Sequence, residues 1–92
     1  MNNEEILRAL RGRLTDADRE QLALGAVYEA ALALESLAEL RQRLRATLAS
    51  IDGELPMVAL SVGRALAALA QVSVALEEVE AVAEQQADAL AK

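Results

Sequence analysis

Apolar side chains recur every three or four residues along almost the whole chain, in three stretches joined by short polar segments. A spacing of this kind places the apolar residues on one face of an α-helix. The stretches cover about residues 3–13, 16–52 and 56–91. The pattern therefore predicts an all-α fold in a single helical domain, residues 1–92, with a short N-terminal helix followed by a long antiparallel helical hairpin.

The turn of this hairpin is expected at residues 53–55. Gly53 suits the left-handed conformation that ends a helix, and Pro56 suits a first helical turn, where its missing N–H would be unpaired anyway. At the start of the long arm, Thr15 is the predicted N-cap, and Asp18 three residues later completes a near capping box. The two long helices are therefore expected to fold back on each other.

The short first helix is predicted to be amphipathic. Asn2 or Asn3 is its expected cap, and acidic residues follow in the first turn, where the helix dipole favours them. Its apolar stripe consists of Ile6, Leu7, Leu10 and Leu14, opposite Arg8 and Arg11.

Each arm of the hairpin carries an apolar seam for contact with the other arm. In the second helix the expected seam is Val27, Ala30, Leu34, Leu37, Leu40, Leu44, Leu48, Ile51 and Leu55, with Arg41, Arg43 and Arg45 turned away. In the third helix it is Val58, Val62, Ala65, Leu69, Val72, Leu76, Val79, Ala83, Ala87 and Leu90. The alternating spacings of four and three in the third helix are typical of a left-handed coiled-coil contact.

Both arms have more apolar surface than one seam uses. A second row of the third helix, opposite its seam, repeats every seven residues: Leu60, Ala67, Val74 and Ala81. Between residues 22 and 34 the second helix is apolar on both sides, and such a helix is expected to be buried all round. The partner for this surface is the first helix, a second copy of the chain or a foreign protein. The expected partner or dimer interface comprises Leu22, Leu24, Tyr28, Ala31, Leu32, Leu60, Arg64, Ala67, Gln71 and Val74.

Several of these side chains have a second interpretation. Tyr28, the only aromatic residue, is either an interface anchor or a rim contact with the first helix. Arg64 either anchors a partner or packs its stem while its charged head reaches water. Gln71 either sets the register of a coiled coil or marks the edge of the apolar stripe. Gly25 and Gly63 are expected to permit close helix crossing, because glycine inside a helix otherwise costs about 1 kcal/mol.

Charge is unevenly distributed along the hairpin. A turn at residue 54 places residue i of one arm opposite about residue 108 − i of the other. The open end then carries Glu77, Glu78, Glu80 and Glu84, expected on the solvated flank and outer face, whereas the turn end is neutral to slightly basic. Two hairpins laid antiparallel would bring unlike ends together, so an antiparallel homodimer is expected.

The composition favours helices with small side chains in the core. The 92 residues include 21 alanines and 17 leucines, a composition typical of long helices. A core of Leu, Val and Ala fills little volume per residue, and a chain of this length buries a modest share of its surface unless it associates. The composition therefore strengthens the expectation of an oligomer.

The residue types exclude most catalytic and metal chemistry. The chain has no histidine and no cysteine, which removes Ser-His-Asp and Cys-His sites, the usual zinc ligands and the Glu-x-x-His pairs of di-iron bundles. Its four glycines are scattered and form no phosphate-binding loop. We expect no enzyme activity, no bound metal and no cofactor.

Charge and hydropathy also restrict the partner and the compartment. A net charge of −6 argues against nucleic acid as partner, although an acidic mimic of DNA stays open. The polar, acidic start lacks the features of a signal peptide, so a cytoplasmic protein is expected. Residues 57–76 are largely apolar but include Arg64 and Gln71 and lack aromatic belts, so a membrane span is not expected.

These observations lead to one main functional hypothesis and two alternatives. The main hypothesis is a non-catalytic protein–protein interaction module, a small bacterial or phage regulator, adaptor or inhibitor that forms a homodimeric helical bundle and binds another protein through apolar helix faces. One alternative is a designed or purely structural bundle with a small apolar ligand near Ser61, Gly63, Gln71 and Ser73. The minor alternative is a membrane-active small protein.

Overall fold

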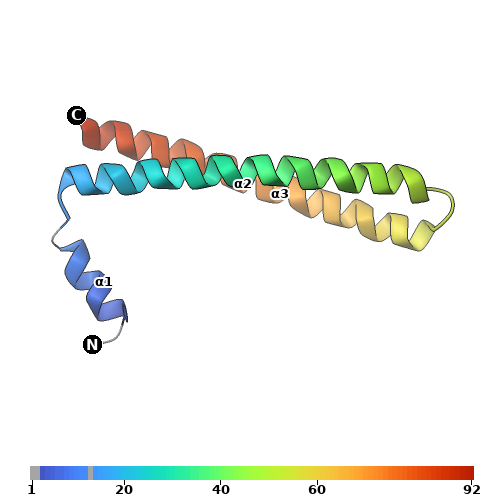
Figure 1. Ribbon diagram of the computed structural model, residues 1–92, viewed down its shortest axis with the longest axis horizontal. Helices are drawn as coiled ribbons and strands as arrows, with labels where there is room; N and C mark the ends of the chain where they lie inside the picture. Colours follow the sequence, from blue (N-terminus) through green and yellow to red (C-terminus); the bar gives the residue numbers. More distant parts are fainter. Residues whose placement is uncertain (1–2, 13) are drawn as a thin grey trace.

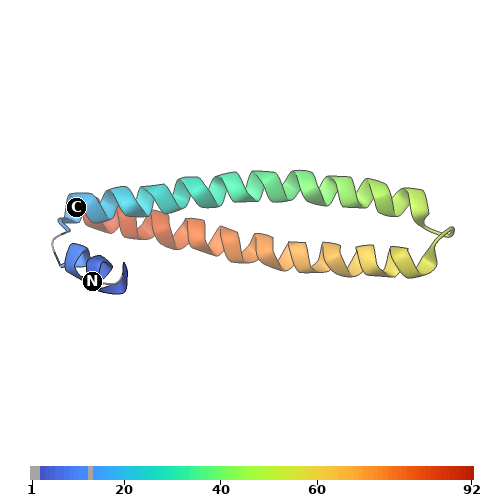
Figure 2. The ribbon, with the colours of Figure 1, turned by 60° about the horizontal axis from the view of Figure 1, so that its bottom comes forward.

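The computed structural model of the chain describes residues 3–12 and 14–92, except for the side chains of residues 8–11. Within this part of the chain there are three helices and no strand: α1 (Asn3–Arg11), α2 (Asp16–Ile51) and α3 (Pro56–Ala91). Helices α2 and α3 lie side by side in both views, and α1 projects from their open end (Figures 1 and 2). The predicted all-α helical hairpin with a short N-terminal helix is confirmed.

The start of α2 is fixed by the predicted capping box. The Thr15 backbone N–H donates to Asp18 Oδ2 at 3.0 Å, and the Asp18 backbone N–H donates to Thr15 Oγ1 at 3.1 Å. These bonds satisfy donors that a helix start otherwise leaves unpaired. The suggested Asn2 cap of α1, and the side chains of Arg8, Leu10 and Arg11, lie outside the described residues.

The turn of the hairpin has the conformation that its sequence predicts. Gly53 has a φ of 86°, in the left-handed region that glycine adopts without steric cost. The backbone N–H groups of Glu54 and Leu55 both donate to the Ile51 carbonyl, at 3.0 and 2.9 Å. Pro56 then occupies the first turn of α3. This arrangement reverses the chain within four residues.

In α2, the residues shielded by α3 differ from the expected seam at several positions. The buried or half-buried residues that follow alternating spacings of three and four are Glu20, Ala23, Val27, Ala30, Leu34, Leu37, Arg41, Leu44, Leu48 and Ile51. Leu40 and Leu55, which were expected in the seam, are 42% and 52% exposed. Arg41, which was expected to point away, takes the seam position instead.

In α3, four of the ten expected seam residues are exposed. The buried or half-buried residues at alternating spacings are Ala59, Val62, Leu66, Leu69, Ser73, Leu76, Glu80, Ala83, Ala87 and Leu90. The prediction of Val58, Ala65, Val72 and Val79 as seam residues is wrong, because all four are exposed. Glu80 was expected on the solvated flank, and that prediction is also wrong. These two runs of α2 and α3 are called the hairpin seam below.

The hairpin seam includes charged side chains, and one of them has a shielded nitrogen without a hydrogen-bond partner in the described part of the chain. Arg41 is half-buried, and its Nε is shielded from solvent with no hydrogen-bond partner among the described residues. Matching the seam residues of the two helices gives a register in which Arg41 lies level with Leu66, and Val27 with Glu80. Polar groups at such positions weaken a small apolar contact.

The hairpin exposes an unusual amount of surface for its size. Among the described residues only Ala30, Ala83 and Ala87 are buried, and helix α1 makes no contact with α2 or α3. The accessible surface is 7084 Å², whereas a compact monomer of 9.8 kDa exposes about 5,200 Å². The radius of gyration is 19.4 Å, against about 12 Å for a compact domain of this length.

Gly25 and Gly63 do not mark close helix crossings within the chain. A Cβ added at either position meets no atom within 4 Å, so the expected packing reason for both glycines is wrong for the single chain. Gly53 differs because its positive φ strains any other residue.

Alanine substitutions at two glycines should therefore have opposite effects. Gly63→Ala is expected to raise the free energy of unfolding by about 1 kcal/mol, because it removes backbone entropy from the unfolded chain without a clash. Gly53→Ala is expected to lower it by about 1 kcal/mol, because alanine is strained in the left-handed region. Urea unfolding followed by circular dichroism measures both. A loss of stability for Gly63→Ala would show that a partner approaches that glycine closely.

The capping box predicts a pH dependence at the start of α2. The backbone hydrogen bond from Thr15, followed by the Thr15 side chain, lowers the pKa of Asp18 below its ordinary value of 3.8. A lowered folded pKa means that the stabilisation is present above the unfolded pKa and is lost as the pH falls through the folded value.

We therefore expect Asp18→Asn to lose stability near neutral pH and to show a smaller fall in melting temperature on acidification below about pH 4. Thr15→Ala should cost about 1 kcal/mol near neutral pH. Asp88→Asn, at an exposed position of α3, is the control for removing one acid. Equal acid sensitivity of wild type and Asp18→Asn would contradict this assignment.

Candidate interaction surfaces

Helix α3 carries a continuous exposed apolar row next to the hairpin seam. Its members follow alternating spacings of three and four: Val58, Ser61, Ala65, Ala68, Val72, Ala75, Val79 and Val82, here called the valine face. The four valines are between 45% and 50% exposed. Each member of this row precedes a residue of the hairpin seam by one position. Because each residue turns the helix by about 100°, the centre of the row lies roughly 100° from the centre of the hairpin seam. The valine face therefore has the spacing of a second coiled-coil contact, and the described part of the chain does not cover it.

The same side of the hairpin continues onto α2. In an antiparallel helix pair, the residues that flank the seam on one side of both helices face the same direction. On α2 these are the half-buried Ala26 and Ala33 and the exposed Leu40. The valine face therefore belongs to a broad apolar side formed by both helices.

A shallow apolar groove lies on the valine face toward the open end of the hairpin. Its volume is about 500 Å³, and it is lined by Ala75, Glu78, Val79, Val82 and Ala83. The groove is open to solvent along its length, as expected for a surface between side chains of one helix. Its chemistry suits apolar side chains of another helix.

A second apolar side lies on the opposite flank of the hairpin. It is formed by Leu24, Tyr28 and Ala31 of α2 and by Leu60, Ala67, Val74 and Ala81 of α3, all exposed, and is here called the Tyr28 flank. Tyr28 is 63% exposed and Val74 65%. The fold thus places six of the ten predicted interface residues on one side of the molecule.

The other four predicted interface residues lie elsewhere. Leu32 of α2 and Arg64 and Gln71 of α3 face away from the hairpin seam, on the backs of their helices, and Leu22 lies toward the side of the valine face. All four are exposed. Arg64 makes no ion pair with a described residue, which favours neither of its two interpretations.

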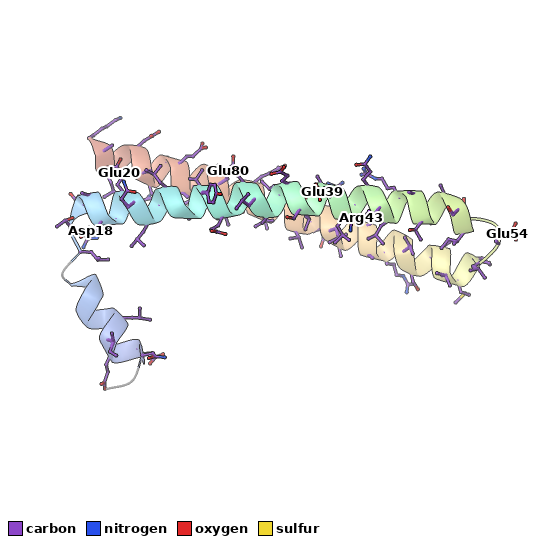
Figure 3. All side chains as sticks on the ribbon, viewed as in Figure 1. Asp18, Glu20, Glu39, Arg43, Glu54 and Glu80 are labelled. Carbon is purple, nitrogen blue, oxygen red and sulfur yellow. The ribbon has the colours of Figure 1, made fainter. Side chains whose placement is uncertain are left out.

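Charge separates the two ends of the hairpin. Figure 3 shows Asp18, Glu20 and Glu80 toward the open end, Glu39 and Arg43 toward the turn, and Glu54 at the turn. Residues 16–35 and 73–92 contain ten acids with Arg19 and Lys92, whereas residues 36–72 contain three acids and four arginines. Arg19 and Asp16 form a salt bridge at 3.2 Å, which lies within helix α2.

The side chains that could take part in metal or ligand binding are spread over the described residues. No group of three or more His, Cys, Asp or Glu residues is placed to hold a metal ion within this part of the chain. Ser61, Gly63, Gln71 and Ser73 lie on different sides of α3, because their positions around the helix differ by about 80° or more, from the hairpin seam outward to the back of the helix. The Ser73 hydroxyl donates to the Leu69 carbonyl of its own helix at 3.1 Å.

One described helix, α3, is long and apolar enough to cross a membrane by length and composition alone. The most apolar part of Pro56–Ala91 has a mean hydropathy of 1.6. None of that part is buried within the hairpin. A helix that packs in a soluble assembly passes the same test.

The valine face is the candidate surface that the sequence pattern did not separate from the seam. Three of its valines, Val58, Val72 and Val79, were expected in the contact with α2, because they are more apolar than Ala59, Ser73 and Glu80, which occupy that contact in the structure. The signal was present in the sequence as the width of the apolar arc, which covers about 160° of α3 when each residue is given 100°. One partner helix covers only part of such an arc.

No family model, curated protein or solved structure matches this chain.

Proposed function

We propose that the protein is a non-catalytic protein–protein interaction module. In this proposal the chain forms a homodimeric helical bundle and binds another protein through its remaining apolar flank, as a small regulator, adaptor or inhibitor does. The supporting observation is the pair of exposed apolar sides, the valine face and the Tyr28 flank, on a hairpin whose buried described residues are three alanines. Contiguous exposed apolar patches on soluble proteins mark interaction sites.

The excess surface supports an assembly of this size. The chain exposes roughly 1,900 Å² more than a compact monomer of equal mass. Standard protein interfaces bury about 800 Å² per partner. The excess is therefore about the area that one dimer contact and one further protein contact would bury together. Part of the excess belongs to helix α1, which is detached from the hairpin.

The protein contact is tested by affinity capture from the source organism with two matched variants. Val74→Asp places a charge at the centre of the Tyr28 flank, at a side chain that is 65% exposed and contributes little to the hairpin seam. Ala46→Asp places the same charge on an exposed part of α2 outside both apolar sides. We expect a protein that wild type and Ala46→Asp capture and that Val74→Asp loses. Identical captures by all three proteins would contradict a partner on this flank.

A membrane is the second candidate, because α3 is apolar enough to span one. Arg64 lies within the apolar run and argues against insertion, since a charge at the centre of a bilayer costs about 2.5–3.5 kcal/mol or more. We expect the chain to stay in the supernatant when it is sedimented with vesicles of phosphatidylcholine and phosphatidylglycerol. Recovery with the vesicles would favour the membrane function over the protein interaction.

A further inference from the structure

The valine face has the pattern of a self-complementary seam. In an antiparallel contact between two copies of α3, residues whose numbers add up to about 140 lie opposite each other. Val58 then meets Val82 of the second copy, Ala65 meets Ala75, and Ala68 meets Val72. In every facing pair except the one that contains Ser61, the residues of both copies are apolar.

The charged row beside the valine face has the same symmetry. Arg64, Gln71 and Glu78 are exposed and spaced seven residues apart, so they form one line along α3. A two-fold axis at the level of Gln71 brings Arg64 of each copy next to Glu78 of the other copy. The dimer then has two such opposite-charge contacts. Within one chain these residues are 14 positions apart on one helix, about 21 Å, and cannot pair.

Helix α2 repeats this arrangement on its own side of the hairpin. Glu29, Ser36 and Arg43 are also exposed, spaced seven residues apart and placed toward the side of the valine face. An axis at the level of Ser36 brings Glu29 next to Arg43 of the second copy. Figure 3 shows Arg43 on α2 between Glu39 and the turn.

The axis inferred from α2 and the axis inferred from α3 lie at the same height along the hairpin. The register of the hairpin seam pairs residues whose numbers add up to about 107, as for Arg41 with Leu66 and Val27 with Glu80. Ser36 and Gln71 satisfy the same register. A single two-fold axis therefore creates four opposite-charge contacts, two between the α2 helices and two between the α3 helices.

We propose that a second copy of this chain covers the valine face, antiparallel to the first, about a two-fold axis at the level of Ser36 and Gln71. This inference rests on the homodimer of the proposed function and assigns its face and orientation. The dimer is a four-helix bundle in which α3 packs on α3 and α2 on α2. The Tyr28 flanks of both copies stay outside it.

Charge and shape both favour the antiparallel orientation. It sets the open half of one hairpin, with its ten acids, against the turn half of the other, with its four arginines. A parallel dimer would place the two acidic halves together, and like charges in contact are unfavourable. The groove on Val79 and Val82 then lies level with Met57 and Val58 of the second copy, which are 75% and 48% exposed.

The test uses the two single charge reversals Arg64→Glu and Glu78→Arg. Each homodimer then contains two like-charge contacts, and we expect its dissociation constant to rise about tenfold, because surface pairs contribute roughly 0.2 to 1 kcal/mol each. A heterodimer of the two variants has opposite charges at both contacts. Mixing equal amounts should therefore give about 90% heterodimer by native mass spectrometry, instead of the statistical half.

The control is a mixture of Arg64→Glu with Glu77→Arg. Residue 77 is exposed and adjacent in sequence, but it lies toward the Tyr28 flank. We expect the statistical half of heterodimer, because the heterodimer contains one like-charge and one opposite-charge contact and so lies midway in free energy between the two homodimers. The heterodimer assay remains informative if either variant alone is monomeric or poorly folded, because the mixture restores the pairs.

The outcomes separate this inference from the homodimer itself. Dimers that mix statistically for both pairs of variants would overturn the assigned face and orientation and leave a dimer in place. A chain that is monomeric at all concentrations would overturn the inference together with the homodimer. A monomer in which cross-links join α1 to the valine face would identify α1 as the occupant and overturn both as well.

Discussion

Ala83→Glu is expected to unfold the open half of the hairpin. Ala83 is 8% exposed and lies in the hairpin seam, where the short side chain allows α2 and α3 to approach. A glutamate there is both too large and charged, and a buried unpaired charge costs about 3–5 kcal/mol. A hairpin with so few buried residues has little free energy in reserve.

The control for this variant is Ala81→Glu. Ala81 is exposed on the same helix, two residues away, so the substitution adds the same charge without burial. We expect a melting curve close to that of wild type for Ala81→Glu and a lost or strongly lowered transition for Ala83→Glu. Equal stability of the two variants would show that the hairpin seam is not the contact that holds the helices together.

Arg41→Leu is expected to stabilise the hairpin by about 1–2 kcal/mol. The substitution removes a shielded Nε that has no hydrogen-bond partner among the described residues and replaces it with an apolar side chain in the seam. Arg45→Leu, at an exposed position of the same helix, is the control and should change stability by less than about 0.5 kcal/mol.

Chemical unfolding of both arginine variants measures the difference. A loss of stability for Arg41→Leu would mean that the guanidinium group of Arg41 has a partner in the assembled protein. In that case the arginine fixes the register of the bundle at the expense of stability, as buried polar groups in coiled coils do.

The elements of the fold follow from the sequence because their signals are local. Thr15 and Asp18 form a capping box from two side chains within one turn, and Gly53 with Pro56 sets the turn through its own backbone preferences. Long runs of alanine and leucine with helical spacing make the helices between them. None of these signals depends on the position of a distant residue.

The assignment of seam residues failed because it depends on the partner helix. The apolar arc of α3 includes two possible seams that share Val62, Leu69 and Leu76, one completed by Val58 and Val72, the other by Ala59 and Ser73. The sequence of α3 favours the first, because valine is more apolar than alanine or serine. The structure has the second, since the direction from which α2 approaches is set outside α3.

The same reason explains why the candidate site was predicted only in part. Leu60 and Val74 lie far from the hairpin seam in both possible assignments, so their exposure was predicted. Val58, Ala65, Val72 and Val79 of the valine face were expected in the contact with α2, and their exposure shows only when α2 is placed. Glu80 was likewise expected at the surface, because a charged residue is the last choice for a seam.

The mass of the purified chain in solution tests the central claim most directly. Sedimentation equilibrium at micromolar concentrations is predicted to give twice the chain mass of 9.8 kDa. The melting temperature should rise with protein concentration, because assembly stabilises the folded chain by mass action. A single species of 9.8 kDa with a concentration-independent melting temperature, and no binding of a dye that reports exposed apolar surface, would contradict the account.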